Sequence, residues 1–457
     1  MNILDRLYNN NSEKIAIIYN NVNYTYRELY NMIRRNMCLL TNINIKKNQV
    51  VLLKTSSQFE FIVMFLSLMA QNCWIIPAAY DMSDSEIEEL NNKIEFLQIE
   101  CEQKYFKKTR YQYENDINKN ANNGFYHLTS GTSGEQKLCI RTFDSLENEG
   151  ISYIRTFKFN ENDVFLSCSP LYHSYSLGAV ILPALYVGAT IVSMNGFFPR
   201  RVFDLIDSNN VSVLIMVPIM AKVLASVESQ HYSFNSIRVP LVGAGKISPN
   251  LNDTFYSRFG KSLMSNYGST ETGGLISNVE SYIIDSIGKA MSEVDIKILD
   301  EYNNILPENS IGEIIVKSKG MFNGYYNDNN HNCFYNGYFR MGDLGYIDEN
   351  GYVFLIGRKK NIVKIGGKKI FPTEIENVLN SCQYIEDCAV LGHKRKDGTE
   401  CIVAFVSSSL EIKIIRKFLF ERIEKYKMPN QIIACKKIPR NSNGKINYSA
   451  LKGFINE

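Results

Sequence analysis

The chain has 457 residues, of which 45% are hydrophobic and 21% are charged. These fractions lie close to the averages for soluble globular proteins, so they exclude a disordered chain, a collagen, a coiled coil and a small disulfide-stapled domain. At about 150 residues per domain, the length accommodates two or three domains, each large enough for a hydrophobic core of its own.

The net charge is only +3, but the charges are unevenly distributed along the chain. The segment from Arg358 to the end contains 20 Lys and Arg residues against 10 Asp and Glu residues, whereas the rest contains 30 against 37. A basic C-terminal segment suggests polyanionic ligands, such as nucleotides, coenzyme A or an acidic carrier protein. A lysine-rich solvated surface would give the same counts, so charge alone does not decide between these interpretations.

The ten cysteines form no Cys-x-x-Cys pair, which argues against a zinc site and a disulfide framework. The first residues lack the basic-then-apolar order of a signal peptide. A long uncharged stretch, 177–194, is interrupted by Pro183 and by a turn at Gly188, which favours a buried helix and a buried strand over a membrane span. We therefore expect a reduced, soluble, cytoplasmic protein without a membrane span, and we expect no nucleic-acid partner.

Strand-like and helix-like segments alternate from the N-terminus. A capping box of Thr25 and Glu28 opens the first long predicted helix. The predicted strands, rich in Val, Ile and Leu, lie at 14–19, 22–26, 49–54, 73–78, 164–167, 189–194, 211–217 and 239–243. Apolar strands separated by helices indicate an α/β fold with parallel sheets that helices cover on both faces.

The pattern changes after about residue 355. We predict helices at 372–381 and 412–425 and strands at 385–393, 400–407 and 431–436. These elements make a compact α+β module of about 100 residues, a normal domain size. The sequence therefore predicts a large N-terminal domain, 1–357, and a small C-terminal domain, 358–457.

One Gly/Ser/Thr-rich stretch suits a polyphosphate. Residues 129–137 read Thr-Ser-Gly-Thr-Ser-Gly-Glu-Gln-Lys and follow an apolar strand predicted at 125–128. Glycines let backbone N–H groups approach phosphates, hydroxyls donate hydrogen bonds, and a lysine neutralises charge. The pattern is not a Walker loop, because Leu138 follows Lys137 where Ser or Thr would stand. An ordinary flexible linker is the alternative.

Two further stretches could bind a nucleotide. Residues 266–271 read Asn-Tyr-Gly-Ser-Thr-Glu after a strand predicted at 262–265. Their aromatic ring can stack on a base, and their carboxylate can hold Mg²⁺ beside phosphates, although a structural turn is equally compatible. Asp343 can accept hydrogen bonds from both ribose hydroxyls, and Arg358 can contact ribose or phosphate. The alternative is that Asp343 lies in a tight turn and that Arg358 is a surface charge.

The C-terminal segment contains two loops of interest. Gly366 and Gly367 allow another chain or a thin ligand to pass close to the backbone. Residues 439–445 read Pro-Arg-Asn-Ser-Asn-Gly-Lys and present Lys445 near the end of the chain. A lone lysine on such a loop is solvated surface in most proteins.

Each stretch is ambiguous by itself, but their order and spacing resemble the adenylate-forming (AMP-binding) superfamily of acyl-CoA synthetases, stand-alone adenylation enzymes and luciferases. The resemblance extends from 25–29 to Lys445. It implies a ligase that uses ATP and Mg²⁺ to convert a carboxylic acid to acyl-AMP, releasing pyrophosphate. The acyl group would then pass to the thiol of coenzyme A or of phosphopantetheine, after the mobile C-terminal domain rotates about a hinge.

The resemblance also implies roles for individual residues. Lys445 would be the catalytic lysine, Thr270 would contact the α-phosphate, Glu271 would hold Mg²⁺, and Lys360 would be the hinge. The residues implied to bind the nucleotide are Thr129, Ser130, Gly131, Thr132, Ser133, Gly134, Lys137, Gly243, Ala244, Gly245, Asn266, Tyr267, Gly268, Ser269, Asp343 and Arg358. The implied acyl pocket comprises His173, Gly243, Gly268 and Gly273, and the implied thiol tunnel comprises Gly366 and Gly367.

The class of acid depends on residues 170–178, which read Pro-Leu-Tyr-His-Ser-Tyr-Ser-Leu-Gly. They resemble the His-containing motif of fatty-acyl and aryl-CoA ligases, whose histidine lines the acyl pocket. Amino-acid-activating relatives usually have a Phe-Asp pair here, and an unpaired buried ammonium would be costly. We therefore expect a fatty or aryl acid, with a hydrogen-bonded core histidine as the alternative role for His173.

The sequence departs from the family pattern in three ways. Gln136 replaces the usual proline and Met341 the usual threonine, and neither change removes a charge or a phosphate donor. The interval between Pro77 and Tyr126 looks short, which could alter the outer wall of the acyl pocket or oligomerisation.

Four functions remain in competition. The favoured one is an acid–thiol ligase that makes acyl-CoA. A stand-alone enzyme that loads an acyl, aryl or amino acid onto a phosphopantetheinyl carrier protein comes close. Less favoured are a non-catalytic nucleotide-binding homologue and a P-loop NTPase, which the Walker pattern does not support.

Overall fold

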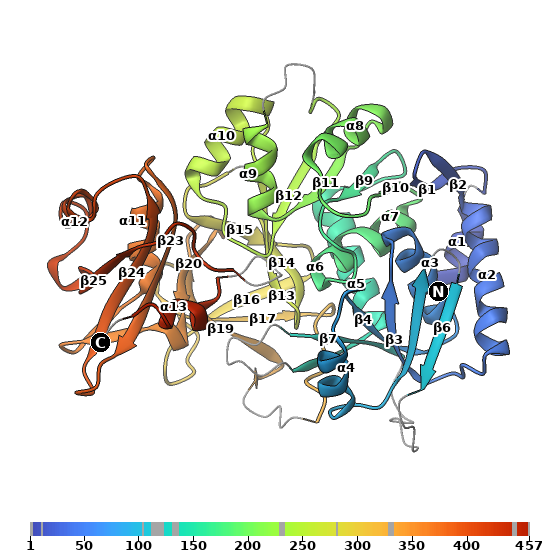
Figure 1. Cartoon of the computed structure of the whole chain (residues 1–457), viewed down its shortest axis with the longest axis horizontal. Coiled ribbons are helices and arrows are strands. Elements are labelled where there is room, and N and C mark those ends of the chain that lie inside the picture. The colour runs from blue at the N-terminus through green and yellow to red at the C-terminus, as the bar shows by residue number, and fades with distance from the viewer. Residues whose placement is uncertain are drawn as a thin grey trace.

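The computed structural model describes residues 3–10, 12–102, 105–110, 123–129, 137–227, 234–279, 282–327, 333–440 and 446–455. Within these ranges two large sheets and their helices form the N-terminal part, and a separate three-stranded sheet forms the C-terminal part at the left of Figure 1. This arrangement confirms the predicted α/β fold with a smaller second domain. The proposed boundary between residues 357 and 358 remains a prediction.

The larger sheet consists of strands from both ends of the N-terminal part. Its members are β1 (Ile15–Tyr19), β2 (Val22–Thr25), β9 (Val164–Ser167), β10 (Thr190–Ser193), β11 (Val213–Met216), β12 (Val239–Gly243), β13 (Met264–Ser269), β14 (Gly273–Ser277), β15 (Ser286–Ala290), β16 (Val294–Leu299), β17 (Gly312–Ser318), β18 (Phe334–Tyr335), β19 (Tyr338–Ile347) and β20 (Val353–Arg358). The order is β16-β17-β19-β20-β15-β14-β13-β12-β11-β9-β10-β1-β2, with β18 paired beside β19. The run from β1 through β10, β9, β11 and β12 to β13 is parallel, as predicted.

The second sheet lies beside the first and contains β3 (Val50–Thr55), β4 (Trp74–Ala78), β5 (Leu97–Glu102), β6 (Tyr105–Arg110), β7 (Gly124–Leu128) and β8 (Leu138–Thr142). Its order is β6-β5-β3-β4-β7-β8. The strands β5, β3, β4 and β7 pair in parallel, whereas β7 and β8 form an antiparallel hairpin.

Helices cover both sheets. They are α1 (Ile3–Asn9), α2 (Tyr26–Asn42), α3 (Gln58–Ala70), α4 (Asp84–Asn91), α5 (Phe143–Phe157), α6 (Ser174–Ser176), α7 (Leu182–Val187), α8 (Pro199–Asn209), α9 (Pro218–Ser226) and α10 (Pro249–Phe259), with a π-helical turn at Leu177–Ile181. One large apolar cluster packs α2, α3, α5 and α7 against the sheets, and another packs α8, α9 and α10 against the opposite side of the larger sheet. None of the helices in the described part of the chain is long and apolar enough to cross a membrane.

Local sequence signals explain several of these boundaries. The β1–β2 hairpin turns at Asn20 and Asn21, whose φ angles of 50° and 63° lie in the left-handed region that Asn tolerates. Helix α2 begins at the predicted capping box, in which Thr25 and Glu28 satisfy each other's backbone N–H groups. All ten cysteines are free.

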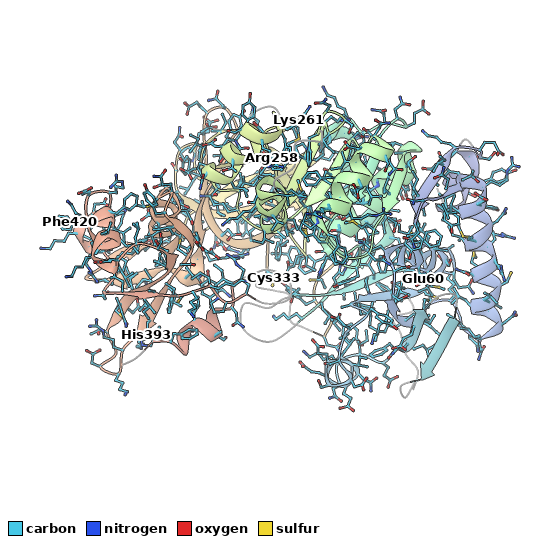
Figure 2. The ribbon with its side chains drawn as sticks, turned by 45° about the horizontal axis from the view of Figure 1, so that its top comes forward. Glu60, Arg258, Lys261, Cys333, His393 and Phe420 are labelled. Atoms are coloured by element: carbon cyan, nitrogen blue, oxygen red, sulfur yellow. The ribbon has the colours of Figure 1, made fainter. Side chains whose placement is uncertain are left out.

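The C-terminal part has its own core. Its sheet consists of β23 (Ile385–Lys394), β24 (Glu400–Ser408) and β25 (Gln431–Ala434), preceded by a two-stranded hairpin of β21 (Val363–Ile365) and β22 (Lys368–Ile370). Helices α11 (Pro372–Asn380), α12 (Ile412–Phe420) and α13 (Tyr448–Lys452) pack around it. Helix α12 ends five residues earlier than predicted, directly after the buried Leu419, and Phe420 extends from it at the outer tip in Figure 2.

Candidate active site

The carboxyl ends of β12 and β13 bring two predicted loops together. The parallel register places Gly243 beside Asn266, so the segment 243–245 and the segment 267–269 lie at the same edge of the sheet. In open parallel sheets, ligands bind at this edge. Ala244 has a φ angle of +60°, a costly conformation for a residue with a side chain, and such strain is concentrated at functional sites.

A buried carboxylate lies beneath this edge. The Tyr267 hydroxyl donates a hydrogen bond to Asp343, and Nε of Arg358 lies 3.0 Å from Oδ1 of Asp343. Asp343 is only 2% exposed, so burial raises the pKa of its carboxyl group, while Arg358 and the Tyr267 hydrogen bond oppose that rise. Asp343 lies on β19 and is not in a turn, directly opposite Arg358 on β20. The site therefore offers one oriented carboxylate beside an aromatic ring.

Tyr325 joins two of the predicted residues. Its hydroxyl donates a 2.8 Å hydrogen bond to Oε1 of Glu271, and Nζ of Lys137 lies 4.9 Å from the centre of its ring. Burial and Glu271 raise the pKa of Tyr325, so the hydroxyl remains a donor. The segment that carries Tyr325 pairs with β8, because Tyr326 N–H bonds to the carbonyl of Leu138. A cation and a carboxylate thus contact the same tyrosine side chain.

The base of the Gly/Ser/Thr loop is closed by two hydrogen bonds. Thr129 N–H donates to the carbonyl of Lys137 at 2.8 Å, and Lys137 N–H donates to the Thr129 hydroxyl at 3.2 Å. The loop therefore leaves and re-enters the sheet at adjacent points of the β7–β8 hairpin. The predicted phosphate contacts at Ser130, Gly131, Thr132, Ser133 and Gly134 lie outside the described residues.

The surroundings of Glu271 fit Mg²⁺ that arrives with a nucleotide. Among the described residues, no group of three or more His, Cys, Asp and Glu side chains is placed to hold a metal ion. Mg²⁺ in nucleotide sites is typically bound by one or two carboxylates together with phosphate oxygens and water. The partly exposed Glu271 carboxylate and the neighbouring Thr270 hydroxyl can supply the protein share of such a shell.

Residues 170–178, called the acyl motif below, reach the same edge of the larger sheet. The Ser174 hydroxyl lies 3.5 Å from the Thr270 hydroxyl, and the rings of Tyr172 and His173 are 4.4 Å apart. The ring of Tyr175 packs beneath Gly243, where an added Cβ would come within 2.6 Å of it. A larger residue at this position would therefore displace the motif.

Two of the predicted glycines leave no room for a side chain. A Cβ on Gly268 would lie 1.9 Å from the carbonyl oxygen of Gly273, so only glycine permits this part of the β13–β14 hairpin. A Cβ on Gly273 would lie 2.3 Å from the Glu149 carboxyl group, so Gly273 faces the protein interior. Neither position was predicted on these grounds.

Tyr325 and His127 were not predicted from the sequence. His127 is 4% exposed, and its Nε2 lies 3.1 Å from the carbonyl oxygen of Tyr172, next to the acyl motif. Burial and the nearby Arg141 lower the pKa of His127 to about 3, so its ring is neutral. A histidine within an otherwise apolar strand was the available signal.

Three of the predicted C-terminal residues, Lys360, Gly366 and Gly367, lie in the described part of the chain. The hinge candidate Lys360 lies in the 3₁₀ turn Lys359–Asn361, and burial lowers its pKa. Gly366 and Gly367 form the β21–β22 turn, where an added Cβ would meet no heavy atom within 4 Å. Lys445 lies outside the described residues, but the base of its loop is held by the ion pair of Arg440 with Asp387, at 2.8 Å.

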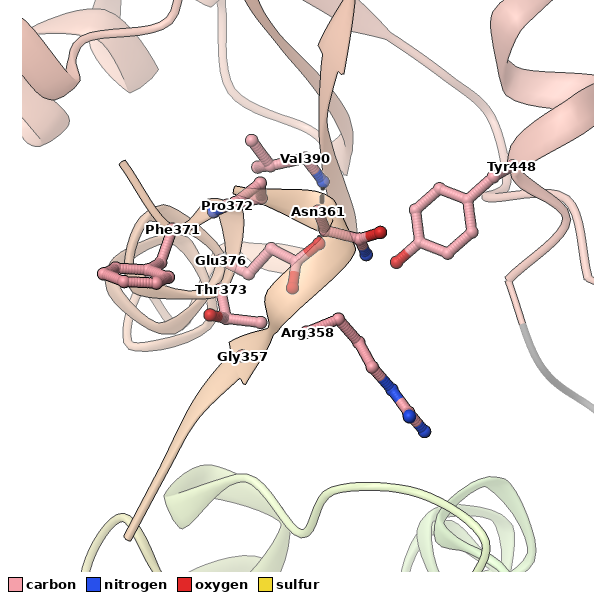
Figure 3. A pocket seen from close by; sticks show the side chains of 9 residues that line it. All are labelled: Gly357, Arg358, Asn361, Phe371, Pro372, Thr373, Glu376, Val390 and Tyr448. Atoms are coloured by element: carbon pink, nitrogen blue, oxygen red, sulfur yellow. Dashed lines mark hydrogen bonds between the residues drawn. The ribbon is translucent and has the colours of Figure 1, made fainter. Parts of the chain in front are cut away.

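A small cavity of about 90 Å³ lies at the junction of the two parts, between the end of β20 and helix α11 (Figure 3). Glu376 and Tyr448 face it from the C-terminal part, whereas the Arg358 side chain points away from Glu376. Burial raises the pKa of Glu376 to about 7, although the carboxylate accepts a 2.8 Å hydrogen bond from Val390 N–H. Nearby, Lys246 donates to Asn377 at 2.8 Å across the junction.

The chain matches two family models: the AMP-binding enzyme model over residues 91–326 and the AMP-binding enzyme C-terminal domain model over residues 374–445. It is 29% identical over 338 residues to an indoleacetate–CoA ligase of Aromatoleum aromaticum, covering 72% of this chain and 66% of that protein. It is 31% identical over 337 residues to a 4-coumarate–CoA ligase of Pinus taeda, covering 70% and 63%. The chain thus spans slightly less than two thirds of the length of these relatives.

The fold of this chain also matches the folds of solved structures. The O-succinylbenzoate coenzyme A synthetase of Bacillus subtilis, in complex with ATP and magnesium ion, superposes with a TM-score of 0.87 at 23% identity, covering 99% of each chain. This likeness supports the fold, and the first family model by itself spans more than half of the chain. The chain therefore belongs to the AMP-binding enzyme family.

Proposed function

We propose that this protein is an acid–thiol ligase that activates a fatty or aryl carboxylic acid with ATP and transfers the acyl group to coenzyme A. The observation that carries the proposal is the position of Tyr325, whose hydroxyl bonds to Glu271 and whose ring contacts Lys137. This places the lysine of the Gly/Ser/Thr loop near a carboxylate suited to Mg²⁺. Binding a metal–polyphosphate needs this combination of charges.

In the proposed site, the loop 129–137 holds the β- and γ-phosphates, and Tyr267 stacks on the adenine. Asp343 accepts hydrogen bonds from the ribose hydroxyls with Arg358 beside it, and Thr270 contacts the α-phosphate. Mg²⁺ bound with the nucleotide would neutralise phosphate charge next to Glu271. The segment 243–245 forms the rim of the adenine and acyl sites, and His173 lines the acyl pocket.

The first step joins the acid to AMP. A carboxylate oxygen of the substrate attacks the α-phosphorus, the bond to the β-phosphate oxygen breaks, and pyrophosphate leaves. Negative charge develops at the α-phosphate, and Thr270 and Lys445 would stabilise it. In the second step a thiol attacks the acyl carbon, loses its proton, and AMP leaves.

The proposed domain organisation serves the two steps. The N-terminal domain, 1–357, holds the nucleotide, and the C-terminal domain, 358–457, would present Lys445 in the first step. Rotation about Lys360 would then bring Gly366 and Gly367 to the thiol. The excess of Lys and Arg in the C-terminal domain favours an anionic acceptor, and the names of the relatives support coenzyme A.

The class of acid follows from the acyl motif and from the relatives. Indoleacetate and 4-coumarate, in the relatives' names, are aryl acids. Residues 170–178 contain no acidic side chain that could pair with the ammonium of an amino acid. We propose a cytoplasmic location, where ten free cysteines would stay reduced.

The test is exchange of labelled pyrophosphate into ATP across a panel of aryl, short, medium and long acyl, and amino acids. Exchange reports only the first step, so it needs no thiol acceptor. One class of acid should drive exchange, and mass spectrometry with coenzyme A and with carrier proteins would then identify the acceptor. Transfer to a carrier protein alone would favour the second function, a stand-alone loading enzyme.

The Lys445→Ala variant separates a ligase from a nucleotide-binding homologue. It should abolish exchange while ATP binding persists, and Lys437→Ala, which removes an exposed lysine of the same domain, should leave exchange unchanged. A folded wild-type protein that binds ATP but exchanges with no acid of the panel would contradict the proposed activity on these acids.

A further inference from the structure

A buried ion pair lies beneath the proposed nucleotide site. Nη2 of Arg141 is 2.8 Å from Oε2 of Glu149, and the two side chains are 0% and 1% exposed. Arg141 comes from β8 and Glu149 from α5. Removing two charges from water costs several kcal/mol per ion. Apolar residues of similar size in their place would often make the fold equally stable. Stability alone is therefore a poor explanation for this pair.

Each member of the pair also binds a backbone group close to Glu271. Oε1 of Glu149 accepts a 3.1 Å hydrogen bond from Gly274 N–H, on the strand that follows the turn carrying Glu271. Arg141 also donates from Nη2 to the carbonyl oxygen of Gly320. Two residues later, Phe322 N–H donates a 2.7 Å hydrogen bond to the carbonyl of Glu271. The pair thus contacts both segments that hold Glu271.

The same pair is linked to the predicted phosphate loop. Arg141 lies on the strand that begins directly after Lys137, and this strand pairs with the segment containing Tyr325. Ile140 N–H donates to the carbonyl of Gly324 at 2.9 Å. The ion pair is therefore the point where the phosphate-loop hairpin, the Glu271 hairpin and the Tyr325 segment meet.

Glycines from distant segments enclose Glu149. A Cβ on Gly178 or on Gly273 would lie within 2.3 Å of its carboxyl group, and a Cβ on Gly320 would lie 3.2 Å from its Cα. The carboxylate can occupy only a narrow space between them. Burial raises the pKa of Glu149, and the Arg141 guanidinium opposes this rise and favours the ionised form.

We propose that Arg141 and Glu149 are positioning residues that set Glu271 for binding the metal–nucleotide complex. They touch neither nucleotide nor metal, and they act through Gly274 N–H and the Gly320 carbonyl. The inference rests on the proposed function, since it assigns Glu271 to Mg²⁺. Partners that orient a metal-binding group are typically worth 10- to 100-fold in metal affinity.

The experiment measures ATP binding to the full-length protein by calorimetry, once with Mg²⁺ and once with EDTA, together with thermal unfolding. The double variant Arg141→Met/Glu149→Leu removes both charges and both backbone contacts, and replacing both members avoids an unpaired buried charge. Arg141→Met/Glu149→Gln keeps an acceptor for Gly274 N–H. A control, Arg238→Met/Asp163→Asn, removes an ion pair in which the buried Asp163, directly before β9, also accepts a hydrogen bond from Ser212.

We expect wild type and the control to bind ATP more tightly with Mg²⁺. The Leu-containing double variant should need about 10- to 100-fold more Mg²⁺ than wild type for the same gain in ATP affinity. Its ATP affinity in EDTA should be unchanged. The Mg²⁺ requirement of the Gln-containing variant should lie between those of wild type and the Leu-containing variant. A folded Leu-containing variant with the wild-type Mg²⁺ requirement would overturn the proposal. If that variant fails to fold, a wild-type requirement in the Gln-containing variant would overturn it instead. Wild-type protein without Mg²⁺-dependent ATP binding would contradict the proposed function itself.

Discussion

Tyr267 donates its hydroxyl hydrogen to Asp343, a carboxylate that is 2% exposed. The two residues are separated by 76 positions in the sequence and meet because β13 and β19 belong to the same sheet. The hydrogen bond restrains both the carboxylate and the ring of Tyr267. A ribose and a base can therefore be bound by two side chains that orient each other.

The first prediction concerns this pair. Tyr267→Phe keeps the ring and removes one hydrogen bond, worth about 1 kcal/mol, so ATP affinity should fall about fivefold. Asp343→Asn removes the charge that Arg358 faces and should weaken ATP binding more, by at least about tenfold. Calorimetric titration with Mg²⁺-ATP measures both. Equal, small losses in the two variants would contradict a direct contact between Asp343 and ribose.

The second prediction concerns the contact between Tyr325 and Glu271. Tyr325→Phe removes the 2.8 Å hydrogen bond to Glu271 but keeps the ring near Lys137. The Mg²⁺ concentration required for tight ATP binding should rise about tenfold, because Glu271 loses its orienting donor. As a control, Tyr335→Phe removes the hydroxyl of a half-buried tyrosine that donates to the carbonyl of Asn303, and it should have no effect.

The third prediction concerns Gly268. In Gly268→Ala, the new Cβ would lie 1.9 Å from a backbone oxygen, so the β13–β14 hairpin must open, and the variant should lose ATP binding and several degrees of thermal stability. Gly260→Ala is the matched control. Its φ angle of +66° disfavours alanine, but the added Cβ would meet nothing within 4 Å. The control should cost only about 1 kcal/mol and retain binding.

The fourth prediction concerns the pH dependence of stability at Glu376. Burial raises the pKa of this carboxyl group from 4.5 to about 7, so between these pH values the folded chain binds a proton that the unfolded chain does not. Stability should therefore fall by about 1.4 kcal/mol per pH unit as the pH rises through this window. Glu376→Gln keeps the acceptor for Val390 N–H and removes the titration.

Urea unfolding of wild type and Glu376→Gln at pH 5 and pH 8 measures the effect. The variant should gain stability relative to wild type at pH 8 and show little difference at pH 5. A difference that is the same at both pH values would show that the group does not titrate in this range.

The parts of the fold that local patterns specify were predicted well. Strand β12 is Val239–Gly243 as expected, because a short strand buried on both faces reads as an uninterrupted apolar run. The strands from β15 to β20 were not predicted. In β19, buried and half-buried residues alternate, and its Gly-Asp-Leu-Gly sequence looks like a turn. Pairing with distant strands decides its conformation.

The candidate site divides in the same way. Loops with unusual composition, such as 129–137, could be found from the sequence, because glycines, hydroxyls and a lysine together indicate phosphate binding. Tyr325 could not be found, since its contact with Glu271 depends on pairing between its segment and β8, almost 190 residues earlier in the chain. Arg141 offered a weak signal as a charge in an apolar strand, but its partner was not evident from the sequence.

The junction between the two parts has a mechanical consequence. Two of its contacts are hydrogen bonds from lysines on the N-terminal side, Lys246 to Asn377 and Lys222 to the carbonyl of Glu386. Water can replace such exposed bonds at a small net free-energy change. The two apolar clusters of the C-terminal part draw their buried members from residues 363–451, so they would stay intact if the junction opened. A change in the orientation of the C-terminal part would therefore leave its core buried.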